Sequence, residues 1–349
     1  MSSDVTAMLQ HFGWLVPLVA AAVSAGLIFI LRPILQRYAL AMPNARSSHR
    51  IPTPQGGGLA VVAGTIVAAL LVPDAFGSPV TSTALLAVFA ASIFIAMVGA
   101  FDDVRPIAVL PRMLLQAAAV VLVIALLPAD LRIAPMLPWI VERALLAVGM
   151  LWFVNLVNFM DGLDLMTVAE IVPLTGGIIL IAALVGMPTD GILVALALLG
   201  AMLGFAPFNR PVARLFLGDV GSLPIGLLTA WLLILLASRG YWAAALLLPL
   251  YYLADATLTL LRRLVNGEPF WQAHRTHFYQ RATDNGLGVG QVVTQVFAVN
   301  IALVVLAVTT VAASSVWISA TALVAGAAAV GWLLHVFATP RNRVPPTEL

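Results

Sequence analysis

Six aspartates lie at or near the ends of strongly apolar segments, in a chain where charged residues are scarce. They are Asp102, Asp103, Asp161, Asp164, Asp219 and Asp255. A carboxylate at such a border carries a large desolvation cost unless a metal ion, a cationic ligand or a water-filled cavity compensates it. Because the six occur in several separate segments, we expect the fold to assemble one active site from them.

The adjacent pair Asp102 and Asp103 in GAFDDVRPI suits a metal–diphosphate site. Mg2+ is usually held by one or two carboxylates together with substrate phosphates and water. A solvated helix end is the alternative interpretation, but two like charges at the C-terminal end of a helix dipole are unfavourable without a cation. Asp219, in the glycine-flanked turn RLFLGDVGSLPIG, is expected to complete the protein ligands of the metal. Mn2+ is the alternative ion for this site.

The segment NLVNFMDGLDLM is a candidate nucleoside pocket. It places Asn155, Asn158, Asp161 and Asp164 at intervals of three, which a helical turn would bring to one face. Asn and Asp suit ribose hydroxyls and the imide edge of a pyrimidine, whereas helix capping explains one such residue but hardly four. Phe216 offers a ring to the base, although packing against lipid or core would explain it nearly as well.

The run NARSSHRIPTPQGGG combines His49 and Arg50 with three consecutive glycines. Glycines let backbone amides approach a phosphate or a sugar closely. A basic turn beside the membrane explains the same run equally well.

A second basic segment, HRTHFYQR, contains His274, Arg275, His277 and Arg281. Arginine binds phosphate bidentately and a protonated histidine donates to it, so this segment predicts a diphosphate clamp. Metal ligation by the two histidines is the rival interpretation, but carboxylates are already available for a hard metal.

The elements that must position these residues are membrane-spanning helices. The chain has 349 residues, of which 62% are hydrophobic and 9% charged, and its mean hydropathy is +1.05, far outside the range of soluble domains. The absence of cysteine excludes disulfides and thiolate metal sites. All 17 basic residues are arginines, only slightly in excess of 15 acids, which argues against a nucleic-acid-binding surface.

Eleven apolar stretches are long enough to cross a bilayer at about 20 residues each, with ten as the alternative count. They lie near residues 13–31, 57–73, 83–100, 113–128, 139–157, 167–186, 191–206, 221–237, 241–261, 291–312 and 315–337. If the N-terminus is outside, only Arg132, Arg143 and Arg239 fall outside, against 14 arginines inside, as the positive-inside rule predicts.

We therefore predict an all-α, polytopic membrane bundle that forms one domain over residues 1–349, with a short cytoplasmic tail at 338–349. Its N-terminus is expected to be periplasmic, and its active site is expected to face the cytoplasm.

Together and in their order along the chain, the five polar segments resemble the polyprenyl-phosphate N-acetylhexosamine-1-phosphate transferase family, of the glycosyltransferase family 4 type. The resemblance runs from about Asn44 to Arg281. It implies a multi-pass enzyme of the bacterial inner membrane that transfers a sugar 1-phosphate from a UDP-N-acetylhexosamine to undecaprenyl phosphate. It also implies release of UMP and a requirement for Mg2+. Whether the chain forms a homodimer is left open.

The resemblance implies roles for the acidic residues. Asp102 matches the family residue proposed as general base, with Asp103 beside it in the metal and phosphate site, and Asp219 matches the direct Mg2+ ligand. Asp255 matches a recurring membrane acid, for which a direct role and an indirect one are equally good. Glu170 matches some members, although a buried structural hydrogen bond would explain it as well.

The remaining matches concern the nucleotide sugar. Asn158, Asp161 and Asp164 match nucleoside-pocket positions, and Phe216 stands where an aromatic residue can stack on uracil. The residues that match the uracil side and the diphosphate-binding loop are Arg50, His274, Arg275 and His277.

The chain departs from the family pattern at three places. Leu165 stands where many members have glycine, Arg50 stands where lysine is frequent, and Tyr279 with Gln280 replaces histidines of several branches. The motifs RSSH and HFYQR are most similar to those of the branch that initiates O-antigen and related surface polysaccharides. The peptidoglycan branch, which uses a muramoyl-pentapeptide donor, fits less well.

A transporter or flippase for an anionic lipid-linked sugar is the alternative from another class. It should spread polar residues through the membrane midplane, whereas here they cluster on one face. The sequence does not determine which N-acetylated sugar is used.

Overall fold

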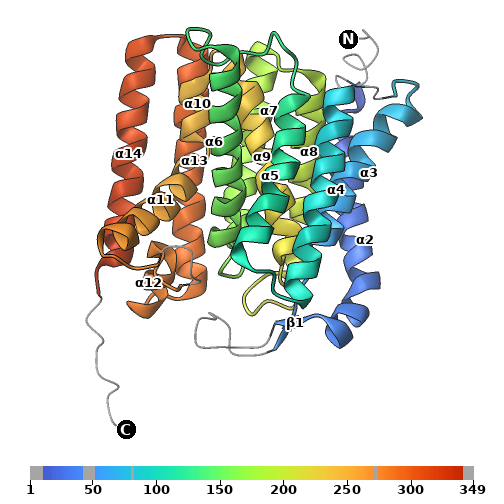
Figure 1. Cartoon of the computed structure of the whole chain (residues 1–349), viewed down its shortest axis with the longest axis vertical. Coiled ribbons are helices and arrows are strands. Elements are labelled where there is room, and N and C mark those ends of the chain that lie inside the picture. Colours follow the sequence, from blue (N-terminus) through green and yellow to red (C-terminus); the bar gives the residue numbers. More distant parts are fainter. Residues whose placement is uncertain (1–10, 42–51, 80–81, 270–273, 341–349) are drawn as a thin grey trace.

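The computed structural model describes residues 11–41, 52–79, 82–269 and 274–340. The protein is an all-α, multi-pass membrane protein whose long helices run side by side (Figure 1). Within the described residues, the only paired strands are β1 (Leu40–Ala41) and β2 (Thr53–Pro54), which are antiparallel. The predicted fold class is confirmed.

Nine helices in the described part of the chain are long and apolar enough to cross a membrane. They are α2 (Leu15–Tyr38), α3 (Gly58–Ala75), α4 (Thr83–Val104), α6 (Trp139–Met160), α7 (Met166–Val185), α8 (Thr189–Phe205), α9 (Asp219–Ser238), α13 (Val289–Ala313) and α14 (Val316–Ala338).

Two of the eleven predicted spans differ from the expectation. The stretch near 113–128 forms α5 (Val109–Ala125), which is apolar but only 17 residues long. The stretch near 241–261 is broken into α10 (Trp242–Leu247) and α11 (Leu250–Val265). Pro249 lies at the break, since proline has no N–H to donate and disfavours a helical residue before it.

The break allows α11 to lie obliquely to the other helices, above the short helix α12 (Phe278–Asp284) (Figure 1). One face of α11 is buried and carries Asp255 and Thr259, while Leu258 and Leu261 on another face are exposed. This amphipathic helix brings a buried carboxylate next to the HRTHFYQR segment. We call this end of the bundle, which also holds the last turn of α4 and the first turn of α9, the site end.

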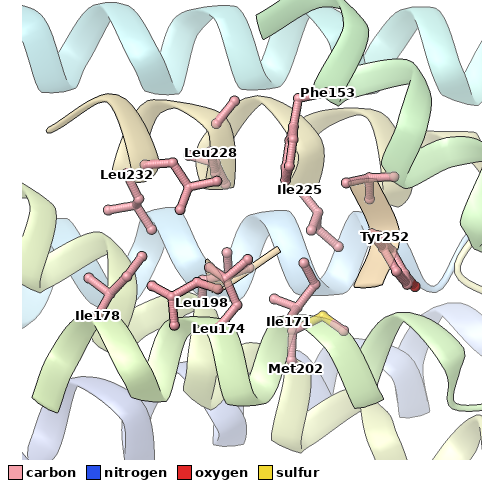
Figure 2. Close-up of a cluster of buried hydrophobic side chains, with 14 of the residues drawn as sticks. Phe153, Ile171, Leu174, Ile178, Leu198, Met202, Ile225, Leu228, Leu232 and Tyr252 are labelled. Carbon is pink, nitrogen blue, oxygen red and sulfur yellow. The ribbon is translucent and has the colours of Figure 1, made fainter. Parts of the chain in front are cut away.

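Helix α9 lies at the centre of the bundle, and its whole apolar stretch is buried. Packing and close fit, not exclusion of water, drive helix association inside a membrane. Figure 2 shows the cluster in which side chains of α9 meet those of α7 and α8, with Phe153 and Tyr252 at its edge. The labelled members from these three helices are Ile171, Leu174, Ile178, Leu198, Met202, Ile225, Leu228 and Leu232.

Two glycine contacts set the position of α9. A Cβ at Gly99 of α4 would overlap the backbone of Asp219, and a Cβ at Gly58 of α3 would overlap the backbone of Gly221. Glycine lets helix backbones approach closely in membranes. The contact at Gly99 therefore places Asp103, one turn further along α4, beside the first turn of α9.

Candidate active site

A cavity of about 560 Å³ lies at the site end. All five of the predicted polar segments contribute to its lining. The predicted site residues that line it are Asp103, Asn158, Asp161, Asp164, Phe216 and Asp219. The cavity is also lined by Thr53, Gln55 and Asn209, which the sequence did not single out, and by Gln280, which it noted only as a departure from the family pattern.

Asp103 caps the N-terminus of α9. Its Oδ1 accepts the backbone N–H of Asp219 at 3.0 Å, and its Oδ2 accepts that of Val220 at 3.2 Å. The residue at the helix start, Gly218, has no side chain, so α4 supplies the cap from a distant part of the chain. A carboxylate at this place also interacts favourably with the helix dipole. Asp103 thus positions Asp219.

Asp102 and Asp219 share a cation, Arg112, which lies in the first turns of α5. Arg112 Nη1 is 2.7 Å from Asp102 Oδ2 and 3.5 Å from Asp219 Oδ2. The other oxygen of Asp102 accepts the backbone N–H of Ile107 at 2.5 Å. The sequence indicated Arg112 only as an inner-loop arginine. The feature of the sequence that could have identified it is its position at the start of the helix that follows Asp102 and Asp103.

Asn158 holds the other oxygen of Asp219. Its Nδ2 donates to Asp219 Oδ1 at 2.7 Å and to the hydroxyl of Ser222 at 2.9 Å. Asn158 is near the end of α6 and Asp219 at the start of α9, so this contact joins the predicted nucleoside segment to the predicted metal ligand.

The donor set was tested against a magnesium ion. Within the described residues, no group of three carboxylate or imidazole side chains is arranged to hold a metal, so the expected three-aspartate shell is not assembled. The physical reason is that both oxygens of Asp103 face the backbone of α9. Mg2+ needs only one or two carboxylates when phosphates and water complete its shell. Asp219 and Asp102 fit that smaller requirement.

The turn after α6 and the loop before α9 form one wall of the cavity. Asp164 Oδ2 accepts the backbone N–H of Ala213 at 2.9 Å. The buried Asn209 accepts the N–H of Leu165 at 2.7 Å and donates to the carbonyl of Leu215 at 2.9 Å. Asn209 was missed, and its signal was an amide in the otherwise apolar run before Arg210.

Leu165 has a φ of +63°, in the left-handed region that favours glycine. This is the position at which the family resemblance leads one to expect glycine. The departure therefore keeps the backbone conformation and adds a side chain, which packs against the core.

Asp161 is half-buried just beyond the last residue of α6, and its Oδ1 accepts the hydroxyl of Thr167 at 2.5 Å. The pKa of Asp161 is raised to about 7, chiefly by burial; the hydrogen bond from Thr167 lowers it, and the charges of Asp103 and Asp164 raise it. Near neutral pH its carboxyl can thus be either a hydrogen-bond donor or an acceptor.

Asn155 does not line the cavity. It is buried, and its Nδ2 donates to Gln116 Oε1 of α5 at 2.8 Å. The predicted single helical face is not formed, because α6 ends at Met160 and residues 161–165 form a turn. Glu170 is likewise buried away from the cavity and accepts from Asn300 Nδ2 at 2.7 Å.

Asp255 is fully buried and anchors the start of α12. Its oxygens accept the backbone N–H groups of Phe278 at 2.9 Å and Tyr279 at 3.0 Å, and Oδ1 is 3.2 Å from His277 Nδ1. It does not line the cavity. The indirect role is thus the better interpretation of this residue. The hydroxyl of Tyr279 donates to the carbonyl of Phe159 at 3.1 Å, which ties α12 to the end of α6.

The predicted diphosphate clamp lies beside the cavity and not in its lining. The rings of His274 and His277 stack with centroids 4.9 Å apart, and Arg275 pairs with Asp284 at 2.9 Å. The guanidinium of Arg281 lies over the ring of Phe278, 5.8 Å from its centroid.

The pKa of His274 is lowered to about 4, chiefly by burial and then by the charges of His277, Arg263 and Arg262. His274 is therefore neutral near pH 7, whereas the sequence argument relied on protonated histidine. A neutral imidazole still has one N–H to donate to a phosphate.

His49 and Arg50 lie outside the described residues. The end of the same segment is described and packs beside the Asp219 turn. Gln55 Nε2 donates to the carbonyl of Asp103 at 2.7 Å, and the N–H of Phe216 donates to the carbonyl of Pro54 at 2.8 Å. The glycine run is thus held close to the acidic cluster.

Comparison with known proteins gives a consistent result. The family model described as Glycosyl transferase family 4 matches residues 85–237. The chain is 26% identical over 326 residues to a probable undecaprenyl-phosphate N-acetylglucosaminyl 1-phosphate transferase of Bacillus subtilis, covering 86% of each protein.

Two further relatives match shorter parts. A decaprenyl-phosphate N-acetylglucosaminephosphotransferase of Mycobacterium tuberculosis is 33% identical over 218 residues, which are 55% of this chain and 52% of the relative. A phospho-N-acetylmuramoyl-pentapeptide-transferase of Lacticaseibacillus paracasei is 38% identical over 113 residues, 32% of this chain and 34% of the relative. The chain thus spans most of the first relative, about half of the second and about a third of the third.

Proposed function

Because the chain belongs to the polyprenyl-phosphate N-acetylhexosamine-1-phosphate transferase family, we propose that it transfers a HexNAc 1-phosphate from a UDP-sugar to undecaprenyl phosphate. The observation that carries this proposal is the contact of Asp102 and Asp219 with one guanidinium at the edge of the cavity. Such a site suits two anionic substrates and a divalent cation.

In the proposed reaction, an oxygen of the lipid phosphate attacks the β-phosphorus of the UDP-sugar. The bond from this phosphorus to the bridging oxygen breaks, and UMP leaves with that oxygen. Asp219 and Asp102 would hold Mg2+, which offsets the negative charge of the two phosphates when bound. Asn158 and Asp103 keep Asp219 in place. Catalysis would rest mainly on positioning and electrostatics.

The nucleoside end of the donor is assigned to the wall that carries Asp161, Asp164 and Phe216. Asp161 is suited to the imide edge of uracil, since a carboxyl with a pKa of about 7 can either donate or accept. Gln280 presents a side-chain amide to the same cavity and is the residue of the HFYQR segment that we assign to the donor.

The site end is proposed to face the cytoplasm of a bacterial inner membrane. Arg105, Arg112, Arg262, Arg263 and Arg275 belong to this end, in the described helix ends and loops that carry the acids. An excess of arginine in the loops of one side is typical of the cytoplasmic side. The HFYQR segment favours an initiating enzyme of O-antigen or related surface polysaccharides.

The test is release of UMP by the purified protein with undecaprenyl phosphate and Mg2+, across UDP-GlcNAc, UDP-GalNAc, their 6-deoxy relatives and the UDP-muramoyl-pentapeptide. Asp219→Asn is expected to lower the rate at least 100-fold. Asp190→Asn is the matched control, because Asp190 lies in the first turn of α8, outside the cavity lining, and its replacement should leave the rate within twofold. Equal UMP release with and without lipid acceptor, or none with any donor, would contradict the proposal.

A further inference from the structure

Arg112 occupies the position between two carboxylates in which a cation is needed. The same nitrogen, Nη1, contacts both Asp102 Oδ2 and Asp219 Oδ2, at 2.7 and 3.5 Å. The two aspartates come from α4 and α9, and the arginine comes from α5. Three helices therefore meet through a single charged contact at the edge of the cavity.

The other oxygens of the acidic cluster are held by rigid partners. Both oxygens of Asp103 accept backbone N–H groups of α9, and the second oxygen of Asp102 accepts the N–H of Ile107. The second oxygen of Asp219 accepts from Asn158. The two oxygens that contact Arg112 are thus the ones whose partner is a long side chain with several rotatable bonds.

The guanidinium is incompletely paired where it lies. Its Nε is buried and has no hydrogen-bond partner among the described residues. The side chain of Arg112 remains 22% exposed, and that of Asp219 is 24% exposed. A buried donor without an acceptor costs free energy, so the pairing of Arg112 is weaker than a bidentate ion pair would be. Another cation can therefore displace the guanidinium of Arg112 from the two carboxylates.

We propose that Arg112 is an internal counter-ion that occupies the metal position when no metal is bound, and that Mg2+ binds by displacing it from Asp102 Oδ2 and Asp219 Oδ2. Without a cation, two carboxylates this close would repel each other. Arg112 keeps them together in the metal-free protein, at the expense of metal affinity. This inference deepens the proposed function, from which it takes the identity of the ion.

The consequence is a competition between one side chain and the metal. Removing the positive charge of Arg112 should strengthen metal binding, even though the site is proposed to bind phosphates, for which an arginine is favourable. A residue that served only to attract phosphates would instead leave metal affinity unchanged when no substrate is present.

The experiment is a titration of the purified protein with Mn2+, followed by the loss of the free-ion signal in electron paramagnetic resonance, with no substrate added. Arg112→Gln is expected to bind Mn2+ about tenfold more tightly than the wild type, or about 1.4 kcal/mol. Arg105→Gln is the matched control. It removes the same charge two residues after Asp103, but its side chain is exposed, so its affinity should change less than twofold. Asp219→Asn should lose binding.

Thermal unfolding is the second readout. In EDTA, Arg112→Gln should unfold at a lower temperature than the wild type, and saturating Mn2+ should remove this difference. Arg112→Lys, which keeps the charge on a shorter side chain, should bind Mn2+ with an affinity between those of the wild type and Arg112→Gln, and serves if the glutamine variant does not fold.

The proposal is overturned if Arg112→Gln binds Mn2+ as the wild type does or more weakly, or if Arg105→Gln gains as much affinity. Failure of the proposed function is a separate outcome, namely no UMP release from any donor, and it leaves the Mn2+ titration readable because that titration uses no substrate.

Discussion

Replacing Gly99 by alanine is expected to inactivate the protein although the substitution adds only one methyl group. A Cβ at Gly99 would lie 2.6 Å from the backbone nitrogen of Val220, and the other nearest atoms are backbone atoms of Asp219. Ordinary van der Waals contact begins near 3.4 Å, so α4 and α9 must separate by about 1 Å. No flexible side chain can absorb this change.

The expected size of the effect follows from that separation. Overpacking of this kind costs about 1–3 kcal/mol, against which the helix propensity of alanine returns up to about 1 kcal/mol. The greater effect is on the rate, because a displacement of about 1 Å at a catalytic group can cost roughly 100-fold. Asp219 and its cap Asp103 lie on the two helices that separate.

The assay is UMP release together with thermal unfolding, and the control is Gly331→Ala. Gly331 also lies within a long helix, α14, but nothing is within 4 Å of its Cβ position. Gly331→Ala should keep full activity and equal or greater stability. If Gly99→Ala released UMP within threefold of the wild-type rate at an unchanged unfolding temperature, the argument that α4 and α9 position Asp219 through this contact would be wrong.

Three further predictions concern the HFYQR region. Asp255→Asn should destabilise the protein by about 2 kcal/mol and lower UMP release at least tenfold. The reason is that an amide nitrogen would then face either the N–H groups that start α12 or the ring of His277. Unchanged activity and an unchanged unfolding temperature would refute this prediction. Tyr279→Phe should lower the free energy of unfolding by about 1 kcal/mol, since the carbonyl of Phe159 loses its hydrogen-bond donor. Denaturant unfolding measures this difference, and an unchanged midpoint would contradict the prediction. His274 has a pKa of about 4 in the folded protein, below the ordinary 6.5, so its contribution to stability is complete above pH 6.5 and is lost as the pH falls from 6.5 towards 4. His274→Gln should flatten the fall in unfolding temperature over that range, and parallel curves for the two proteins would refute the prediction.

The sequence predicted most of the membrane-spanning helices, because hydropathy is summed along a continuous segment and needs no knowledge of its neighbours. It failed at 241–261, where Pro249 interrupts an apolar stretch. Hydropathy also does not reveal that Asp255 and Thr259 lie on a buried face of α11 and pack against other parts of the protein. This packing is the reason that α11 runs in a different direction from the spanning helices.

The sequence by itself determined which residue types reach the site end, since carboxylates, amides and arginines are rare in this chain and collect in a few segments. Only the tertiary structure decided what each one does. Asp102 and Asp103 are neighbours, yet one pairs with Arg112 while the other caps α9, 116 residues further along the chain. The way in which the helices pack determines which side chains meet. Helix contacts such as the one at Gly99 depend on close approach of two backbones, which cannot be predicted from the local sequence of either helix.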